Sequence, residues 1–141
     1  MPLSKAAKNS IMNALTGREY NTLGGTMYLG LSLTAPNDLG EGITEPNSST
    51  GYERVLIGTY GSPATYKMSA AQDGSSYNTT AILFPRAKTN WGTVKYAVFF
   101  TAATGGTFSG WAKLENEKDV NADYVANFDK NAITLSIVDA E

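Results

Sequence analysis

Apolar side chains recur at helical spacing near the start of the chain, and the period then changes to that of β-strands. One face of the predicted helix carries four apolar residues, Ala7, Ile11, Ala14 and Leu15, with Met12 beside them. Ser4 can cap the start of this helix because its hydroxyl accepts from the free amides of the first turn, and Gly17 is suited to end it. The spacing therefore predicts a short amphipathic helix between Ser4 and Gly17.

After the helix, apolar and polar residues alternate in several short segments, which is the pattern of strands with one buried face. The strands predicted in this way are residues 27–33, 52–60, 81–84, 93–101, 107–114 and 132–138. Strict alternation in the clearest of them places Val94 and Phe100 on one face and Phe99 on the other. Residues 61–78 are polar and predict an irregular connection. Residues 34–51 are dense in Pro, Gly, Asn and Asp and predict a long loop of the functional or mobile kind.

This pattern is typical of an all-β fold. We expect a mainly antiparallel, jelly-roll-like β-sandwich with a short N-terminal amphipathic helix. Residues 1–20 are assigned to the helix and its linker, and residues 21–141 to a single β-sandwich domain. A helix this short is marginal in isolation, so it must dock on another surface. Either its own sandwich or a neighbouring subunit provides that surface, and the sequence leaves both open.

The composition supports an all-β chain and excludes several classes of function. Ser, Thr and Asn together form more than a quarter of the 141 residues, which is typical of strands joined by many turns. The chain has no Cys and no His. Thiol nucleophiles, iron–sulfur sites, zinc fingers and imidazole catalysis are therefore excluded.

Charge and hydropathy argue against nucleic-acid and membrane partners. The net charge is −2 and no dense run of Lys and Arg occurs, so the chain is poorly suited to neutralise phosphates. No apolar run approaches the roughly 18 residues that a membrane span needs, and the N-terminus lacks the apolar core of a secretory signal. We therefore expect a protein that is made and kept in a cytoplasm, or in a particle assembled there.

The remaining candidate chemistry predicts neither an enzyme nor a metal site. Asp38, Glu41 and Glu45 supply oxygen atoms on a flexible loop, but their spacing differs from that of a calcium-binding EF-hand. A serine nucleophile would have no His partner, and pairs of carboxylates among 13 acids carry no weight for a glycosidase. We expect no enzymatic activity, no metal and no cofactor.

The aromatic residues and the helix supply the candidates for partner contacts. Trp91 lies in a polar run ahead of a strand, where an indole can stack on a sugar or anchor a protein partner. The alternative, which we favour, is that Trp91 folds back over the end of the core. The candidate partner contacts are Ala7, Ile11, Met12, Leu15, Asp38, Glu45, Tyr52 and Trp91.

Several separated blocks of the sequence resemble those of a known family. In order they are a YLGLS-type strand, a T-x-P turn, a TEP…GY-x-R-V segment and an F-P-x-A…W-G-x-V block before a Gly-Gly turn. They occupy residues 28–32, 34–36, 44–46, 51–55, 84–87, 91–94 and 101–106. These blocks are similar to those of small tailed-bacteriophage virion structural proteins, a group of tail-fibre-like, minor tail and capsid-associated proteins. Thr101 stands where that group has an acid, a departure confined to the turn.

The resemblance implies a non-enzymatic virion structural protein, assembled in the bacterial host cytoplasm and exposed on the particle. The detached helix and the long loop 34–51 predict a homo-oligomer, or a subunit ordered on a larger shell or tail. Its expected partners are copies of itself and other phage structural proteins. The protein would be a capsid decoration (cement) protein or a small tail-fibre or tail-associated subunit. The alternative is a carbohydrate-binding adhesin module that uses Trp91, Tyr52 and the loop 34–51 to recognise host-surface glycans. The chain carries no repeat or long coiled coil of a fibre shaft, so head and tail both remain open.

Overall fold

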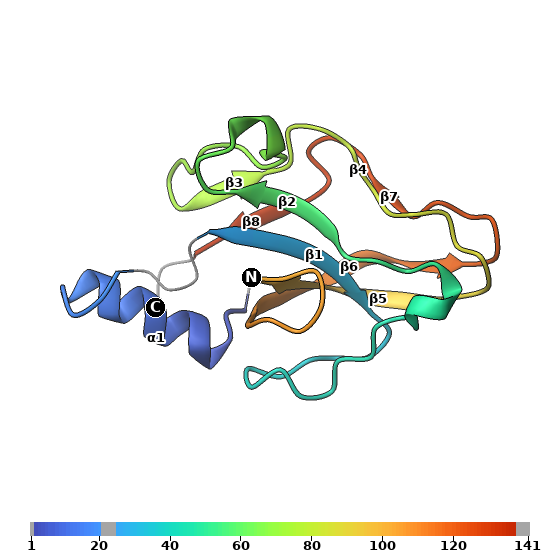
Figure 1. Ribbon diagram of the computed structural model, residues 1–141, viewed down its shortest axis with the longest axis horizontal. Helices are drawn as coiled ribbons and strands as arrows, with labels where there is room; N and C mark the ends of the chain where they lie inside the picture. Colours follow the sequence, from blue (N-terminus) through green and yellow to red (C-terminus); the bar gives the residue numbers. More distant parts are fainter. Residues whose placement is uncertain (1, 21–24, 138–141) are drawn as a thin grey trace.

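The computed structural model describes residues 2–20 and 25–137, and a four-stranded antiparallel sheet forms its centre (Figure 1). The strands are β1 (Thr26–Ser32), β2 (Val55–Thr59), β5 (Gly92–Phe100) and β6 (Phe108–Val120), in the order β2-β1-β5-β6. β5 and β6 form a hairpin, and β1 pairs with both β2 and β5. β1 therefore joins the two halves of the sheet.

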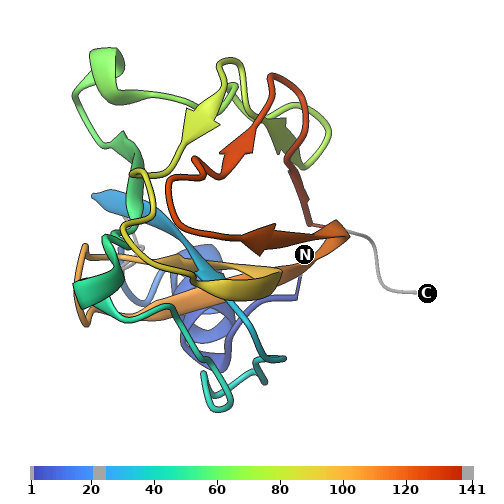
Figure 2. The same cartoon turned by 90° about the vertical axis from the view of Figure 1, so that its right-hand side faces the viewer.

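Two short ribbons cover one face of this sheet (Figures 1 and 2). Each joins distant parts of the chain in antiparallel pairing: β3 (Ser75–Tyr77) with β8 (Thr134–Ser136), and β4 (Ile82–Leu83) with β7 (Asn127–Phe128). The predicted β-rich fold with antiparallel sheets and one N-terminal helix is confirmed. In the described residues the layer over the sheet consists of two separate ribbons, so the jelly-roll-like sandwich is not confirmed.

The core lies between the sheet and the ribbons, where aliphatic side chains of β1 and β5 meet a cluster of aromatic rings. Trp91 meets Tyr52 edge to face with ring centroids 5.3 Å apart, and Phe84 lies 6.4 Å from Trp91. The indole Nε1 donates a hydrogen bond to the Thr50 carbonyl at 3.0 Å. Thr50 belongs to the 3₁₀ turn η1 (Ser48–Thr50). Trp91 therefore closes the core beside this turn, as the favoured interpretation of the sequence predicts.

Long-range pairing changes two features of the predicted strands. β6 extends to Val120 instead of ending at residue 114, because its second half pairs with the start of β5 beyond a bulge that follows Lys113. The same irregularity places Val94 and Phe99 in one core, where strict alternation predicts opposite faces. The predicted facing of Val94 is therefore wrong.

The ribbons depart most from the predicted elements. β3 and the 3₁₀ turn η2 (Pro63–Thr65) lie within residues 61–78, which the sequence predicts as irregular, and β7 corresponds to no predicted strand. β8 covers only part of the predicted strand 132–138, whose Val138 lies outside the described residues. β4 lies within the predicted strand 81–84, so that strand is confirmed. β3 and β7 are too short to show a period, so only their pairing partners define them.

The N-terminal helix α1 (Lys5–Leu15) lies on the opposite face of the sheet from the ribbons (Figure 2). Ser4 caps it as predicted, with its hydroxyl accepting from the Ala7 amide at 3.0 Å. The residues just before the helix pair with the free edge of β6, where the Trp111 amide donates to the Pro2 carbonyl at 3.1 Å. The helix therefore docks on its own chain. No helix in residues 2–20 and 25–137 combines the length and hydropathy that a membrane crossing requires.

Replacing Trp91 with alanine is expected to lower the free energy of unfolding by about 3–5 kcal/mol, because a large buried ring leaves a cavity among its neighbours. Urea denaturation followed by circular dichroism measures the loss. Tyr60→Ala is the matched control, since Tyr60 is 86% exposed, and its effect is expected to stay within about 0.5 kcal/mol. A loss below about 1 kcal/mol for Trp91→Ala would contradict the core role of the indole.

Candidate functional site

Arg54, just ahead of β2, ties two distant loops together. Its Nη2 lies 2.9 Å from Glu45 Oε1, and its Nε donates to the same carboxylate oxygen at 3.0 Å. Its Nη1 donates to the carbonyls of Ala102 at 2.8 Å and Gly105 at 2.9 Å, both in the turn between β5 and β6. The guanidinium carbon lies 3.6 Å from the centre of the Phe100 ring. This combination of an ion pair, charge-assisted hydrogen bonds and a cation–π contact holds the loop 34–54 against the β5–β6 turn.

Tyr52 reinforces the same junction from the core side. Its hydroxyl accepts a hydrogen bond from the Leu31 amide of β1 at 3.0 Å. The ring can cross β1 because residue 30 is a glycine, and a Cβ at Gly30 would lie 2.7 Å from the Tyr52 hydroxyl oxygen. Burial raises the pKa of Tyr52 well above its usual value, and the negative charge of Glu45 raises it further. Tyr52 is therefore a neutral hydrogen-bonding partner at any physiological pH.

Beside this junction lies an open cavity of about 610 Å³, which we call the Arg54 pocket. It is lined by Tyr28, Glu45, Pro46, Ser48, Tyr52, Glu53, Arg54, Ala103, Thr104 and Gly105. Tyr28 is half-buried and Glu53 is exposed. In the part of the chain that the structure describes, neither the Tyr28 hydroxyl nor the Glu53 carboxylate has a hydrogen-bond partner. The pocket therefore combines firmly held walls with polar groups that remain available.

The structure brings two of the candidate contacts, Glu45 and Tyr52, to the Arg54 pocket. Asp38 lies elsewhere, half-buried beneath the start of α1, where its carbonyl accepts from the Lys5 amide at 2.9 Å. Among described residues no group of three or more His, Cys, Asp and Glu side chains is placed to hold a metal ion. The loop acids thus serve chain-internal contacts in this structure.

The candidate contacts on the helix divide into buried and exposed residues. Ala7 is completely buried against the sheet, together with Ser10. Ile11 is half-buried, whereas Met12 and Leu15 are 57% and 75% exposed. The helix therefore docks through its small residues, and the larger apolar side chains near its C-terminal end face outward.

Trp91, the candidate for stacking on a sugar, is buried and only 5% exposed. Tyr52 and Phe84 pack against its ring in T-shaped contacts, and its N–H is already bonded. In this fold the indole offers no free face to a sugar, so an adhesin that stacks a glycan on Trp91 does not fit the structure.

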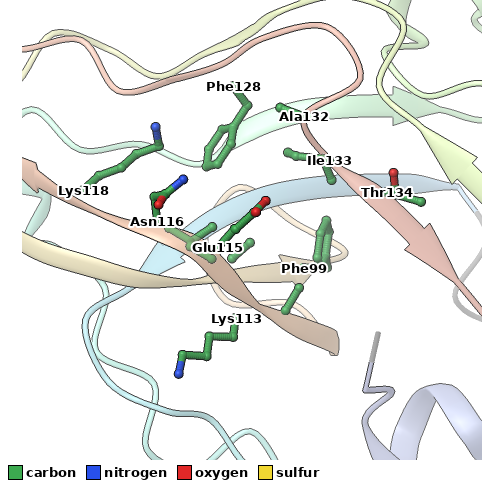
Figure 3. Close-up of a pocket in the computed structure, with 12 residues that line it drawn as sticks. Phe99, Lys113, Glu115, Asn116, Lys118, Phe128, Ala132, Ile133 and Thr134 are labelled. Atoms are coloured by element: carbon green, nitrogen blue, oxygen red, sulfur yellow. The ribbon is translucent and has the colours of Figure 1, made fainter.

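A second, narrower cavity of about 340 Å³ opens beside the bulge of β6 (Figure 3). Phe99 and Phe128 approach it from opposite walls, and the side chains of Glu115 and Asn116 lie near its rim. The two rings are almost fully buried, and Lys118 Nζ lies 5.2 Å from the centre of the Phe128 ring. This crevice therefore lies between side chains of β6 and the segment 128–134, and its two aromatic rings belong to the core.

Sequence reasoning missed the two residues that define the Arg54 pocket, Arg54 and Tyr28. One signal was present, because Arg54 lies inside the predicted strand 52–60 beside the apolar residues Val55–Ile57, and a buried guanidinium requires acceptors. Glu45 lies nine residues away, but the two carbonyl acceptors belong to the turn 102–105, about fifty residues away along the chain, and no local pattern indicates them. In the sequence Tyr28 cannot be distinguished from a tyrosine of the core. Only the folded structure shows that it is half-buried and that its hydroxyl has no hydrogen-bond partner among the described residues.

The structure thus shows a β-rich chain in which Arg54 holds two loops together beside an open pocket. The sequence matches, over residues 2–136, the family model described as podophage GP4 fiber I protein gp80. The chain therefore belongs to this phage fibre family, and the resemblance to tailed-phage virion structural proteins is confirmed, with the tail-fibre type indicated. A search of curated proteins finds no match.

Replacing Arg54 with alanine is expected to lower the free energy of unfolding by about 2–3 kcal/mol, because Glu45 and two carbonyls lose a charged donor. We place the loss below that of a fully buried ion pair because the Glu45 side chain is 20% exposed. Urea unfolding measures the difference. Arg18→Ala, which removes an exposed arginine, is the control. Equal effects of the two substitutions would contradict the role of Arg54 as the tie between the loops.

The raised pKa of Tyr52 makes its contribution to stability fully present below the ordinary tyrosine pKa of about 10 and lost progressively above it. By pH 11 the native protein is expected to lose about 1.4 kcal/mol through this group alone. Tyr52→Phe is expected to be about 1–2 kcal/mol less stable at neutral pH, because the Leu31 amide loses its acceptor. The stability gap between the two proteins should narrow between pH 8 and pH 11 in urea unfolding. A constant gap would contradict the prediction.

Proposed function

We propose that the protein is a small, non-enzymatic structural subunit of the tail-fibre type, exposed on the phage virion. The family match across residues 2–136 carries this proposal. The absence of Cys and His supports a non-enzymatic role, because it removes the thiol nucleophile and the commonest general acid–base group, the imidazole. In this proposal the chain is assembled into the particle in the host cytoplasm.

A tail-fibre role is favoured over capsid decoration by the description of the family as a fibre protein. The chain has no repeat or long coiled coil, so one copy does not form a fibre shaft by itself. In this proposal the protein is a module added to a tail or fibre, in contact with other phage structural proteins and with copies of itself.

The exposed end of α1 is the proposed assembly contact. Met12 and Leu15 lie one turn apart and together present a small apolar surface, while Ala7 and Ser10 hold the helix on the sheet. An apolar helix face that the chain does not cover is suited to a neighbouring protein. Of the candidate helix contacts, the proposal keeps Met12 and Leu15 and the half-buried Ile11, and leaves out Ala7.

A host-recognition role is the second candidate function. The Arg54 pocket favours it, because free polar groups on a rigid frame are typical of a ligand site. Host recognition is compatible with a tail-fibre role for the same protein. Capsid decoration, by contrast, is an alternative to the tail-fibre role.

The number of copies per particle distinguishes a tail-fibre subunit from a capsid decoration protein. Quantitative mass spectrometry of purified virions is expected to give a few to a few dozen copies, and immunogold labelling is expected to mark the tail. A decoration protein would be present in hundreds of copies and would label the head. That result, or absence from the virion, would overturn the proposal.

Met12→Asp combined with Leu15→Asp is expected to reduce incorporation into virions at least severalfold while leaving the fold intact, because a charge on each side chain opposes burial against a partner. Incorporation is measured by complementing a phage that lacks the protein. Asn9→Asp, which adds a charge at another exposed position of the helix, is the control. Normal incorporation of the double variant would exclude this surface as an assembly contact.

A further inference from the structure

We propose that the Arg54 pocket binds a neutral saccharide. The inference rests on the proposed function, since it assumes a protein exposed on the virion, and it goes further by assigning a site and a class of ligand. Its basis is the arrangement of Tyr28, Glu53 and Ser48 around a frame held by Arg54.

The frame of the pocket is preformed. Arg54 contacts Glu45, two carbonyls of the β5–β6 turn and the Phe100 ring, so both loops that line the cavity are held in place without a ligand. The volume of about 610 Å³ lies within the usual range for small-molecule sites. A ligand that enters such a site loses less free energy to ordering of the protein than one that must fold a loop around itself.

The groups left free match a polyol. Tyr28 is half-buried in the pocket wall beside Phe100, its partner across β1 and β5. Within residues 2–20 and 25–137, its ring stacks on no other ring and its hydroxyl has no partner. An aromatic ring of this kind can support the C–H face of a sugar. The exposed Glu53 carboxylate and Ser48 hydroxyl supply an acceptor and a donor–acceptor for sugar hydroxyls.

The charges of the pocket favour a neutral ligand over an acidic one. Arg54 is the only basic residue that lines the cavity, and its charge is already paired with Glu45 at 2.9 Å. Glu53 then leaves the lining with one uncompensated negative charge. A sugar carboxylate or phosphate would meet repulsion there, whereas uncharged hydroxyls would not.

The crevice beside β6 is a weaker candidate for a sugar. Its aromatic residues Phe99 and Phe128 are 2% and 6% exposed, so neither ring offers a face for stacking. Lys118 already lies over the Phe128 ring (Figure 3). Of these two cavities, the Arg54 pocket is the one with a half-buried aromatic side chain, Tyr28, in its wall.

The test is titration of the isotope-labelled full chain with neutral trisaccharides, followed by amide chemical shifts. Maltotriose, cellotriose, mannotriose and N,N′,N″-triacetylchitotriose are the neutral probes, and 3′-sialyllactose is the acidic one. At least one neutral probe at millimolar concentration is expected to shift resonances of residues 28, 48, 53 and 103–105, and to bind more tightly than the acidic probe.

Two pairs of variants make the test specific. Tyr28→Ala is expected to weaken binding about 10-fold by removing the stacking surface, whereas Tyr28→Phe keeps the ring and should change affinity little. Glu53→Gln is expected to weaken binding about threefold to tenfold. Tyr60→Ala, which removes an exposed ring outside the pocket, is the control and should bind normally. Amide spectra establish that each variant is folded.

Three results would overturn the proposal: no shifts with any neutral probe, shifts that map outside the pocket, or preference for the acidic probe. Unchanged affinity of a folded Tyr28→Ala variant would overturn it as well. If Tyr28→Ala and Glu53→Gln instead lower incorporation into virions while no sugar binds, the pocket is a subunit contact. That outcome rejects the saccharide but leaves the proposed fibre role standing, whereas absence of the protein from virions rejects the role itself.

Discussion

The contacts of the Arg54 guanidinium hold together the two loops that form the pocket surface of this protein. A buried positive charge is costly unless every donor finds an acceptor, and here the acceptors come from two loops that the sheet alone would leave apart. Satisfying the charge therefore requires the long loop and the β5–β6 turn to meet. Tyr52 extends this requirement inward, because its hydroxyl bonds β1 and its ring packs on Trp91. The surface junction and the aromatic core are consequently one continuous structure.

The two faces of the central sheet are covered in different ways. The ribbons and their aromatic cluster bury one face, while α1 covers part of the other through Ala7 and Ser10 (Figure 2). Small side chains let the helix approach the sheet closely, but they bury little apolar area. Much of the attachment therefore comes from backbone pairing of the preceding residues with the edge of β6. That pairing also protects part of an edge strand that would otherwise be open.

A protein of a phage fibre must keep its fold outside a cell and must also expose a surface to a neighbouring subunit or a ligand. The junction around Arg54 meets the first need with an ion pair, hydrogen bonds and packing, since the chain has no cysteine for disulfides. The free groups of Tyr28 and Glu53 and the outward apolar end of α1 are the surfaces proposed for the second need. Different elements form these two surfaces, so the proposed subunit contact and the proposed ligand contact do not compete for the same residues.

The sequence by itself determined the features that depend on neighbours along the chain. The period and caps around Ser4 and Gly17 predict the helix, and alternation predicts the main strands, because both arise from local geometry. Only the tertiary structure decided the features that depend on distant partners. The bulge in β6 sets the facing of Val94, and β3 and β7 exist only through their pairing partners. Arg54 finds its two carbonyl acceptors about fifty residues away. The burial of the Trp91 ring and the free hydroxyl of Tyr28 also depend on residues distant in the sequence. The local sequence shows that an aromatic ring is present, but not which residues cover it.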